Sequence, residues 1–275
     1  MFGSLAVRTD AVRIAIIPSC QQVRCFKQLL RDSFVHALVG ASESPNGNAD
    51  CSLEGMMKRM RILIDRRDAG QRLAKLLGKY QGRQDCIVIA LPRGGVPVGF
   101  EVARALGLPL DICLVRKLGV PFQPELAMGA VAMGGVTVLH EDVISDLDIT
   151  EHEVQQEAAS ELEELRRREQ VYRGNRPMPA LEGKTVLLVD DGIATGATAE
   201  AAMEALRRLG VKHLVVAVGV APPDTITRLR RYADEVVSVL TPATLSSIGE
   251  WYEDFRQTTD MEVVDLLHLS STKAA

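Results

Sequence analysis

The chain has 275 residues and a net charge of −4, with 47% hydrophobic and 25% charged residues. This length suits one large domain, or one domain with an appendage. The mildly acidic balance gives no electrostatic basis for binding nucleic acid or a membrane surface. No apolar run approaches the length of a membrane helix, and the five cysteines show no metal-type spacing. These features predict a globular protein of the reducing cytoplasm.

Residues 1–57 differ from the rest of the chain. They contain three of the five cysteines and include a polar, low-complexity stretch at 41–48. We expect them to be a poorly ordered N-terminal extension, and one hypothesis is that it is an artefact of choosing an upstream start codon. A targeting peptide is the alternative, but the acidic residues of the extension match its basic ones in number. A well-patterned domain is predicted over 58–275.

Strands and helices alternate along this domain. Its first half is expected to contain, in order, a helix capped by Asp65 and ending near residue 80, a strand at 86–90, a helix to about residue 106, a strand at 111–115, a loop at 116–128 and a hairpin at 129–138 that turns at Gly134–Gly135. Its second half is expected to contain, in order, a charged helix at 151–172 capped by Thr150, a strand at 186–189, an alanine-rich helix, a strand at 214–220, a helix at 223–232 and a strand at 235–240.

The strands are apolar and are separated by helices, which predicts an α/β fold with a mostly parallel sheet and helices on both faces. The helix at 151–172 is dense in charge, with Glu and Arg three or four residues apart. We interpret its charged face as solvated, with contact to a second copy in a homodimer as the alternative.

Two adjacent carboxylates, Asp190 and Asp191, close the strand at 186–189. In open α/β sheets, ligands bind at such carboxyl ends of strands. The carboxylates suit sugar hydroxyls or a magnesium shell, but they cannot hold a phosphate. The small-residue loop that follows suits a phosphate, because backbone N–H groups at a helix start attract anions. Its residues are Ala194, Thr195, Gly196, Ala197 and Thr198.

The run Val189-Asp-Asp-Gly-Ile-Ala-Thr-Gly-Ala-Thr198 resembles the motif with which type I phosphoribosyltransferases bind phosphoribosyl pyrophosphate (PRPP). The resemblance implies the fold of that family, here with a C-terminal hood and a helical insertion. It implies that Asp190 and Asp191 grip the ribose hydroxyls, with Mg²⁺ held only indirectly by them, and that residues 194–198 hold the 5-phosphate. A capped turn without a ligand is the alternative interpretation.

The segment Leu91-Pro-Arg-Gly-Gly-Val-Pro97 also follows a strand and precedes a helix. Gly94 and Gly95 let the backbone approach an anion closely, and Arg93 adds a forked cation. The position of this segment resembles the pyrophosphate loop of the family. That resemblance implies a non-proline cis peptide at Arg93–Gly94 or Gly94–Gly95. A purely structural glycine turn is the alternative.

The segment Arg116-Lys-Leu-Gly-Val-Pro121 is similar to the start of the flexible catalytic loop in adenine-type phosphoribosyltransferases. Such a loop closes over the reacting centre and excludes water. The resemblance makes Lys117 the candidate cation for the leaving pyrophosphate, with Arg116 second. Glu125 is a candidate contact of the acceptor. A solvated basic turn is the alternative.

The chain departs from one branch of the family at Ala194, where hypoxanthine-guanine enzymes place an acid that acts on the purine ring. This departure removes support for hypoxanthine or guanine as acceptor. Adenine-, orotate- and uracil-type chemistry stay open.

Aromatic residues gather in Trp251-Tyr-Glu-Asp-Phe255, which contains the only tryptophan of the chain. Trp251 and Tyr252 could form a hood that stacks on the acceptor base, or they could form a terminal core patch. This ending and the segment Asp65-Arg-Arg-Asp-Ala-Gly70 are similar to a subgroup of bacterial phosphoribosyltransferases whose substrates are poorly defined.

These observations predict a magnesium-dependent glycosyltransferase of nucleotide metabolism. It would transfer the ribose 5-phosphate group of PRPP to a nitrogen acceptor, such as a nucleobase, and release pyrophosphate. The alternatives are a regulatory protein that binds PRPP or a nucleotide, and a hydrolase or phosphorylase of phosphoribosyl compounds. No residue pattern identifies the acceptor.

Overall fold

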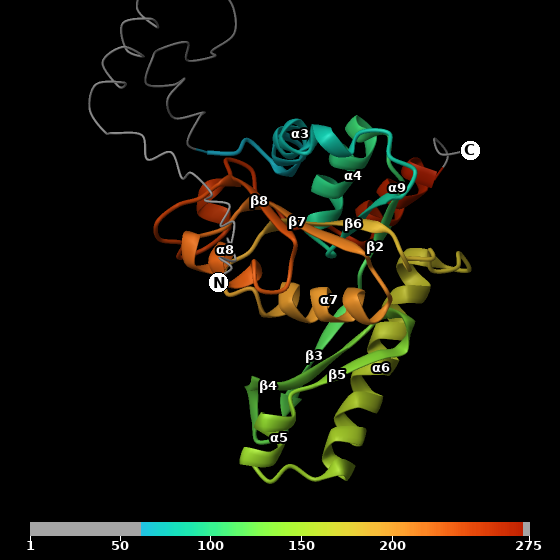
Figure 1. The fold of residues 1–275 in the computed structure, drawn as a ribbon, viewed down its shortest axis with the longest axis vertical. Helices are drawn as coiled ribbons and strands as arrows, with labels where there is room; N and C mark the ends of the chain where they lie inside the picture. Colours follow the sequence, from blue (N-terminus) through green and yellow to red (C-terminus); the bar gives the residue numbers. More distant parts are fainter. Residues whose placement is uncertain (1–61, 272–275) are drawn as a thin grey trace, which may run out of the picture. The chain divides into compact units, whose positions relative to one another are not determined.

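The computed structural model describes residues 62–271, all within one compact unit. The extension expected at 1–57 lies outside the described residues. A parallel sheet of five strands, in the order β2-β1-β6-β7-β8, runs through the centre of the described part (Figure 1). Its strands, in chain order, are β1 (Cys86–Ala90), β2 (Leu110–Ile112), β6 (Thr185–Gly192), β7 (His213–Val220) and β8 (Glu235–Leu240).

Helices cover both faces of this sheet, because alternate side chains of its apolar strands point to opposite faces. One face packs against α3 (Arg66–Leu76) and α4 (Gly95–Leu106). The other packs against α7 (Ala197–Arg208) and α8 (Pro223–Leu229), as Figure 1 shows. The predicted α/β architecture with a mostly parallel, doubly covered sheet is confirmed.

A second sheet has three antiparallel strands, in the order β3-β4-β5. Its strands are β3 (Val115–Val120), β4 (Gln123–Ala132) and β5 (Val136–Leu139), with the short helices η2 (Met133–Gly135) and α5 (Glu141–Asp146) after β4 and β5. The long helix α6 (Glu151–Arg173) packs on this sheet, where Val154 and Leu165 join the same core cluster as Leu118 and Val131.

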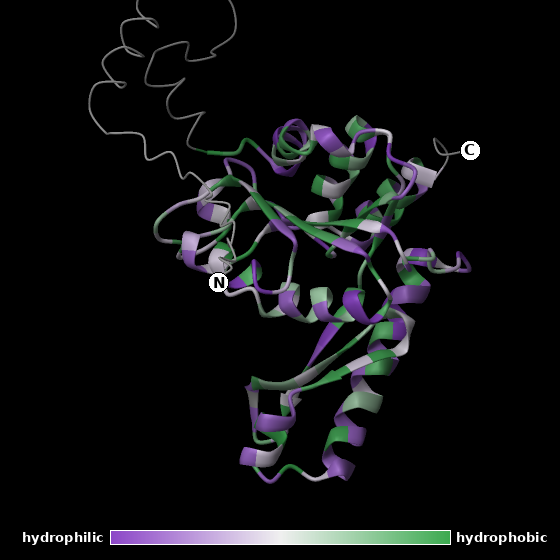
Figure 2. Cartoon of the chain, in the orientation of Figure 1, coloured by the Kyte–Doolittle hydropathy of each residue, from purple (hydrophilic) through white to green (hydrophobic). Residues whose placement is uncertain are grey.

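The long helix α6 combines a packed face with a solvated one. Hydrophobic residues line its inner side, and hydrophilic residues alternate with them along its length (Figure 2). Thr150 caps it as predicted, in a capping box with Glu153. Contact with a second copy stays a prediction. Within residues 62–271, no helix is long and apolar enough to cross a bilayer.

The expected loop at 116–128 is wrong, because these residues form β3 and the first part of β4. Leu118, Val120 and Met128 are fully buried against α6, and this burial stabilises a hairpin. The strand expected at 111–115 is also divided, since β2 ends at Ile112 and β3 begins at Val115. The turn at Gly134–Gly135 is confirmed, with φ of 72° and 74°. Four helical segments were not predicted as helices: η2, at the predicted turn, α5, η3 (Gly249–Trp251) and α9 (Asp260–Ser271).

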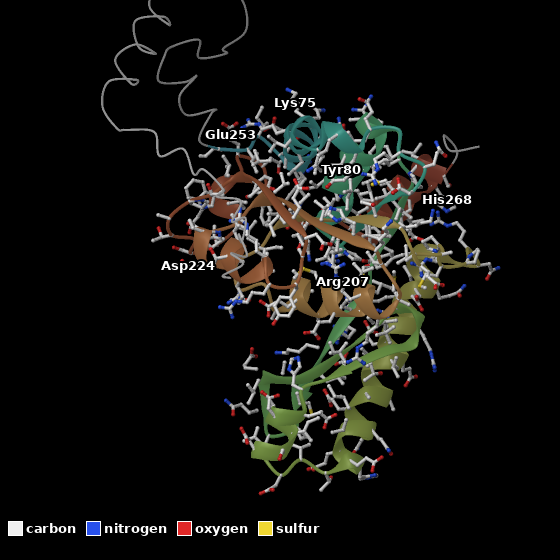
Figure 3. The ribbon with its side chains drawn as sticks, viewed as in Figure 1. Lys75, Tyr80, Arg207, Asp224, Glu253 and His268 are labelled. Atoms are coloured by element: carbon white, nitrogen blue, oxygen red, sulfur yellow. The ribbon has the colours of Figure 1, made fainter. Side chains whose placement is uncertain are left out.

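Polar side-chain and backbone groups form hydrogen bonds at the amino edge of the central sheet. The Tyr80 hydroxyl, in η1 (Gly78–Tyr80), donates to Glu235 Oε2 at the start of β8 (2.7 Å). Thr185 N–H donates to Asp85 O at the start of β6 (2.8 Å). Lys75 and Tyr80 lie on the α3 side of the sheet and Arg207 on the α7 side (Figure 3). The carboxyl edge, where the predicted site lies, carries the loops instead.

Candidate functional site

The acidic pair lies at the carboxyl end of the central strand β6, as predicted. Asp190 pairs in register with Val218 of β7, which fixes the backbone of the pair within the sheet. The Asp191 N–H donates to Asp190 Oδ1 (2.9 Å). Asp191 is buried, with 8% of its surface exposed, and Asp190 is half-buried. Two carboxyl groups are therefore held side by side with little water around them.

This crowding raises the pKa of Asp190. Burial and the adjacent carboxyl of Asp191 raise the pKa of Asp190 well above its usual value, and Arg66 only partly opposes them. Ionising Asp190 therefore costs more in the protein without a ligand than ionising a solvated carboxyl does, and such perturbed carboxyls are common at functional sites.

We expect Asp190→Asn to raise the melting temperature at mildly alkaline pH. A carboxyl whose pKa is higher in the folded than in the unfolded protein makes stability fall as pH rises between those two values. The amide removes that loss and keeps the oxygen that accepts from Asp191 N–H. Thermal unfolding in metal-free buffer should show a difference from wild type that grows with pH. Asp265→Asn, at an exposed position of α9, is the control. A variant that melts at or below wild type at mildly alkaline pH contradicts this expectation.

The predicted pyrophosphate loop, residues 91–97 and called the glycine loop below, contacts the acidic pair directly. A Cβ atom placed on Gly94 would lie 2.0 Å from Asp191 Oδ2, and one on Gly95 would lie 2.6 Å from Val189 O. Only glycine permits this approach, because real Cβ atoms do not come so close to other heavy atoms. The predicted pyrophosphate loop and the acidic pair therefore form one continuous surface.

The expected position of the cis peptide is wrong by one or two residues. The structure has it between Pro92 and Arg93, not at Arg93–Gly94 or Gly94–Gly95. The peptide units around the glycines already belong to the start of α4. Gly94 has helical φ and ψ, and the N–H of Gly95 donates to Leu91 O (3.0 Å). Arg93 is partly exposed, with Nη1 3.6 Å from Asp260 Oδ1.

The predicted phosphate loop connects β6 to α7. Gly196 has a left-handed backbone (φ 81°) and precedes the first residue of α7, Ala197. Thr225 Oγ1 donates to Ala194 O (2.6 Å) and anchors the loop to α8. Thr195 and Thr198 are exposed, so their hydroxyls are open to a ligand together with the first N–H groups of the helix.

Lys117 and Arg116, the candidate cations of the predicted catalytic loop, lie on strand β3 rather than on a flexible loop. Lys117 is 42% exposed, and its Nζ lies 3.3 Å from Glu125 O. Arg116 donates through Nε to Glu161 of α6. Glu125 is almost fully exposed at the far end of the hairpin.

Both cations line cavities that they share with Thr198 of the phosphate loop. Lys117 and Thr198 line a cavity of about 160 Å³ together with His140. Arg116 and Thr198 line a smaller one of about 30 Å³ with Pro92. The structure thus brings the glycine loop, the phosphate loop and the β3 cations together, whereas Glu125 lines neither cavity.

The C-terminal aromatic segment contacts the backbone of the acidic pair through Tyr252. Tyr252 is only 6% exposed, and its hydroxyl donates to Asp191 O (2.5 Å). Trp251 is half-buried and packs against the core that covers the α3 side of the sheet. Tyr252 belongs to that same core, as the core-patch interpretation had it. Contact of Trp251 or Tyr252 with an acceptor stays a prediction.

One residue of the site was not predicted from the sequence. Arg66 Nε donates to Asp191 Oδ2 (2.8 Å), across 125 positions of the chain. Its only signal was its place in the Asp65–Gly70 segment, where the neighbouring Asp65 does cap α3 as expected. Within residues 62–271, no group of three or more His, Cys, Asp and Glu is placed to hold a metal ion. A metal at this site would therefore depend on ligand atoms as well as on the acidic pair.

Comparisons with known proteins agree with this arrangement. Residues 64–251 match the family model described as a phosphoribosyl transferase domain. Proteins of two Mycobacterium tuberculosis strains, provisionally named phosphoribosyl transferases, are 47% identical over 208 residues, which cover 76% of this chain and 47% of theirs. The chain thus spans about half the length of the curated relatives it matches. The crystal structure of TT1426 from Thermus thermophilus is 43% identical, with a TM-score of 0.68, and the match covers 75% of this chain and 97% of that one.

Proposed function

Because the chain belongs to the phosphoribosyl transferase domain family, we propose that it transfers the ribose 5-phosphate group of PRPP to a nitrogen acceptor. One observation carries the proposal: the glycine loop touches the acidic pair so closely that a Cβ on Gly94 would lie 2.0 Å from Asp191 Oδ2. A sugar whose hydroxyls bind the carboxylates would present its neighbouring pyrophosphate to the backbone of that loop.

Each part of PRPP has a partner of suitable chemistry. The 5-phosphate lies at the N-terminus of α7, where N–H groups and hydroxyls of Thr195 and Thr198 bind it. The ribose hydroxyls donate to Asp190 and Asp191. The pyrophosphate lies among backbone N–H groups and cations, contributed by Arg93, Gly94, Gly95, Arg116 and Lys117.

The acidic pair also fits a magnesium ion that arrives with the substrate. Mg²⁺ is usually held by one or two carboxylates together with substrate phosphates and water, rather than by a cage of protein ligands. Asp190 and Asp191 would hold such an ion indirectly, by accepting hydrogen bonds from its water ligands, and the described residues contain no larger cluster of metal ligands. When bound, the ion neutralises charge on the leaving pyrophosphate.

In the proposed reaction, the bond from the anomeric carbon to the pyrophosphate oxygen breaks, and its electron pair leaves with the oxygen. Positive charge then develops on the ribose ring, and the fixed carboxylate of Asp190 stabilises it electrostatically. The guanidinium of Arg93 and the ammonium of Lys117 balance the charge of the leaving group. The acceptor nitrogen donates its lone pair to the anomeric carbon and loses its proton to solvent water.

The phosphate loop does not supply an acid for the acceptor. Ala194 stands where hypoxanthine-guanine enzymes carry one, and its carbonyl is already used by Thr225. We therefore propose an acceptor that needs no such acid, with Glu125, Trp251 and Tyr252 as the residues to examine for contact.

Acceptor-dependent release of pyrophosphate from PRPP tests this function. Nucleobases and small amines are added singly to protein, PRPP and Mg²⁺, and pyrophosphate is measured. Transfer predicts release only when one class of nitrogen compound is present. Release in water alone would indicate a hydrolase. PRPP binding without release for any acceptor would indicate a regulatory protein.

A further inference from the structure

Two segments from opposite ends of the domain meet at the acidic pair. The chain at Leu63 runs parallel to the chain at Tyr252 in an isolated β-bridge. Leu63 N–H donates to Trp251 O, and Glu253 N–H donates to Leu63 O, and the N···O distance is 2.8 Å in each case. This bridge joins the segment Asp65–Gly70 to the aromatic segment 251–255. The proposed function uses Asp191 but does not explain why both segments converge on it.

Arg66 makes three contacts at this meeting point. Its Nε donates to Asp191 Oδ2 (2.8 Å), and its Nη1 donates to Arg256 O (2.6 Å). Its guanidinium carbon lies 4.0 Å from the centre of the Phe255 ring. The Asp65 side chain accepts from Asp68 N–H (2.7 Å) and so starts α3 directly before Arg66. The Arg66 side chain is only 13% exposed.

The surroundings of Asp191 leave its carboxylate little freedom. Arg66 binds one carboxylate oxygen, the Gly94 backbone lies against that same oxygen, and the Tyr252 hydroxyl binds the main-chain carbonyl. Asp190 differs, since within residues 62–271 it forms no ion pair with a cationic side chain. The two acids of the pair are therefore inequivalent among the described residues: Asp191 is paired with a cationic side chain, and Asp190 is not.

We propose that Arg66 is a positioning residue of the ribose site, acting through Asp191. It holds the Asp191 carboxylate in one orientation and ties it to the Phe255–Arg256 segment, so that the acidic pair and the C-terminal segment form one rigid unit. Asp191 then orients the ribose as a fixed acceptor, and the unpaired Asp190 faces the charge that develops on the ring. This role rests on the proposed function.

Calorimetric titration of PRPP in the presence of Mg²⁺ tests the role. Arg66→Lys keeps the charge but loses the planar fork that makes two hydrogen bonds and stacks on Phe255. We expect PRPP binding to weaken about tenfold or more, the loss expected for a broken charge-assisted hydrogen bond. Arg67→Lys is the matched control, since Arg67 is the next residue on α3 and its side chain is 73% exposed. The control should bind PRPP as tightly as wild type.

A double-mutant cycle separates positioning from general stability. If Arg66 acts through Asp191, Arg66→Lys should weaken binding much less in an Asp191→Asn background than in wild type. All titrations are made at a temperature where every variant is folded by circular dichroism. Wild-type affinity in Arg66→Lys, or an equal loss in both backgrounds, overturns the role of Arg66 alone. A wild-type protein that binds no PRPP overturns the proposed function, and this role with it.

Discussion

Replacing both carboxylates of the acidic pair with amides, Asp190→Asn with Asp191→Asn, is expected to abolish PRPP binding while the fold survives. An amide oxygen accepts from a sugar hydroxyl more weakly than a carboxylate does. Hydrogen bonds to charged groups contribute about 1.5–3 kcal/mol each, so losing two of them weakens binding at least a hundredfold. Calorimetric titration of PRPP with Mg²⁺ measures the loss.

The double amide should remain folded, because it keeps the shape of both side chains and the oxygen that accepts from Asp191 N–H. Circular dichroism and thermal unfolding check this. A pair of substitutions at exposed acids, Asp142→Asn with Asp265→Asn, removes the same formal charge away from the site. Equal PRPP affinity in the double amide and in this control would remove Asp190 and Asp191 from the ribose site.

The second large effect, on both stability and PRPP affinity, is expected from Gly94→Ala, which adds a single methyl group. Gly94→Ala places its Cβ 2.0 Å from Asp191 Oδ2, so the carboxylate or the loop must move by more than an ångström. The carboxylate cannot turn away freely, because Arg66 holds the same oxygen at 2.8 Å. Overpacking of this kind costs about 1–3 kcal/mol in stability. We expect a lower melting temperature and a loss of PRPP affinity of at least tenfold.

Gly78→Ala is the matched control for the glycine loop. Gly78 lies in η1 and does not adopt a positive φ, and a methyl group there would meet open space among the described residues, apart from its own chain neighbours and helix backbone. The substitution should leave PRPP binding and the melting temperature close to wild type. Normal PRPP affinity in Gly94→Ala would show that contact between the loop and Asp191 is not required for the site.

The parts of the fold that could be predicted from sequence are those with a local signal. Strand β8 is found at the residues expected, Glu235–Leu240, because its apolar, β-branched run is bounded by polar residues. The capping of α3 by Asp65 and of α6 by Thr150 also follows from side chains adjacent to each helix. The acidic pair was placed at the end of a strand for the same reason.

The hairpin of β3 and β4 could not be predicted in this way, because two prolines in it favour a loop. Pro121 lies in the turn between the strands, where no ladder hydrogen bond is needed. Pro124 lies in a stretch of β4 for which, among the described residues, β3 is the only partner strand, since β5 pairs with Gly129–Ala132. The pairing of β3 with β4 is also irregular, with register shifts on both sides of Gly119.

The contact between Arg66 and Asp191 could not be predicted from the sequence for a different reason. It joins residues 125 positions apart, and no periodicity in either segment encodes that distance. The position of the cis peptide could be predicted only in part. The sequence pointed to the correct loop, but where α4 begins decides which peptide bond lies outside the helix.

The most direct test of the central claim follows the ribose itself. Wild-type protein is incubated with Mg²⁺, PRPP labelled in the ribose carbons, and a mixture of small nitrogen compounds, and the products are separated by mass spectrometry. Transfer predicts a labelled ribose 5-phosphate joined to a nitrogen atom of one acceptor class, in an amount equal to the pyrophosphate released. Recovery of all label as PRPP or as free ribose 5-phosphate would contradict the account.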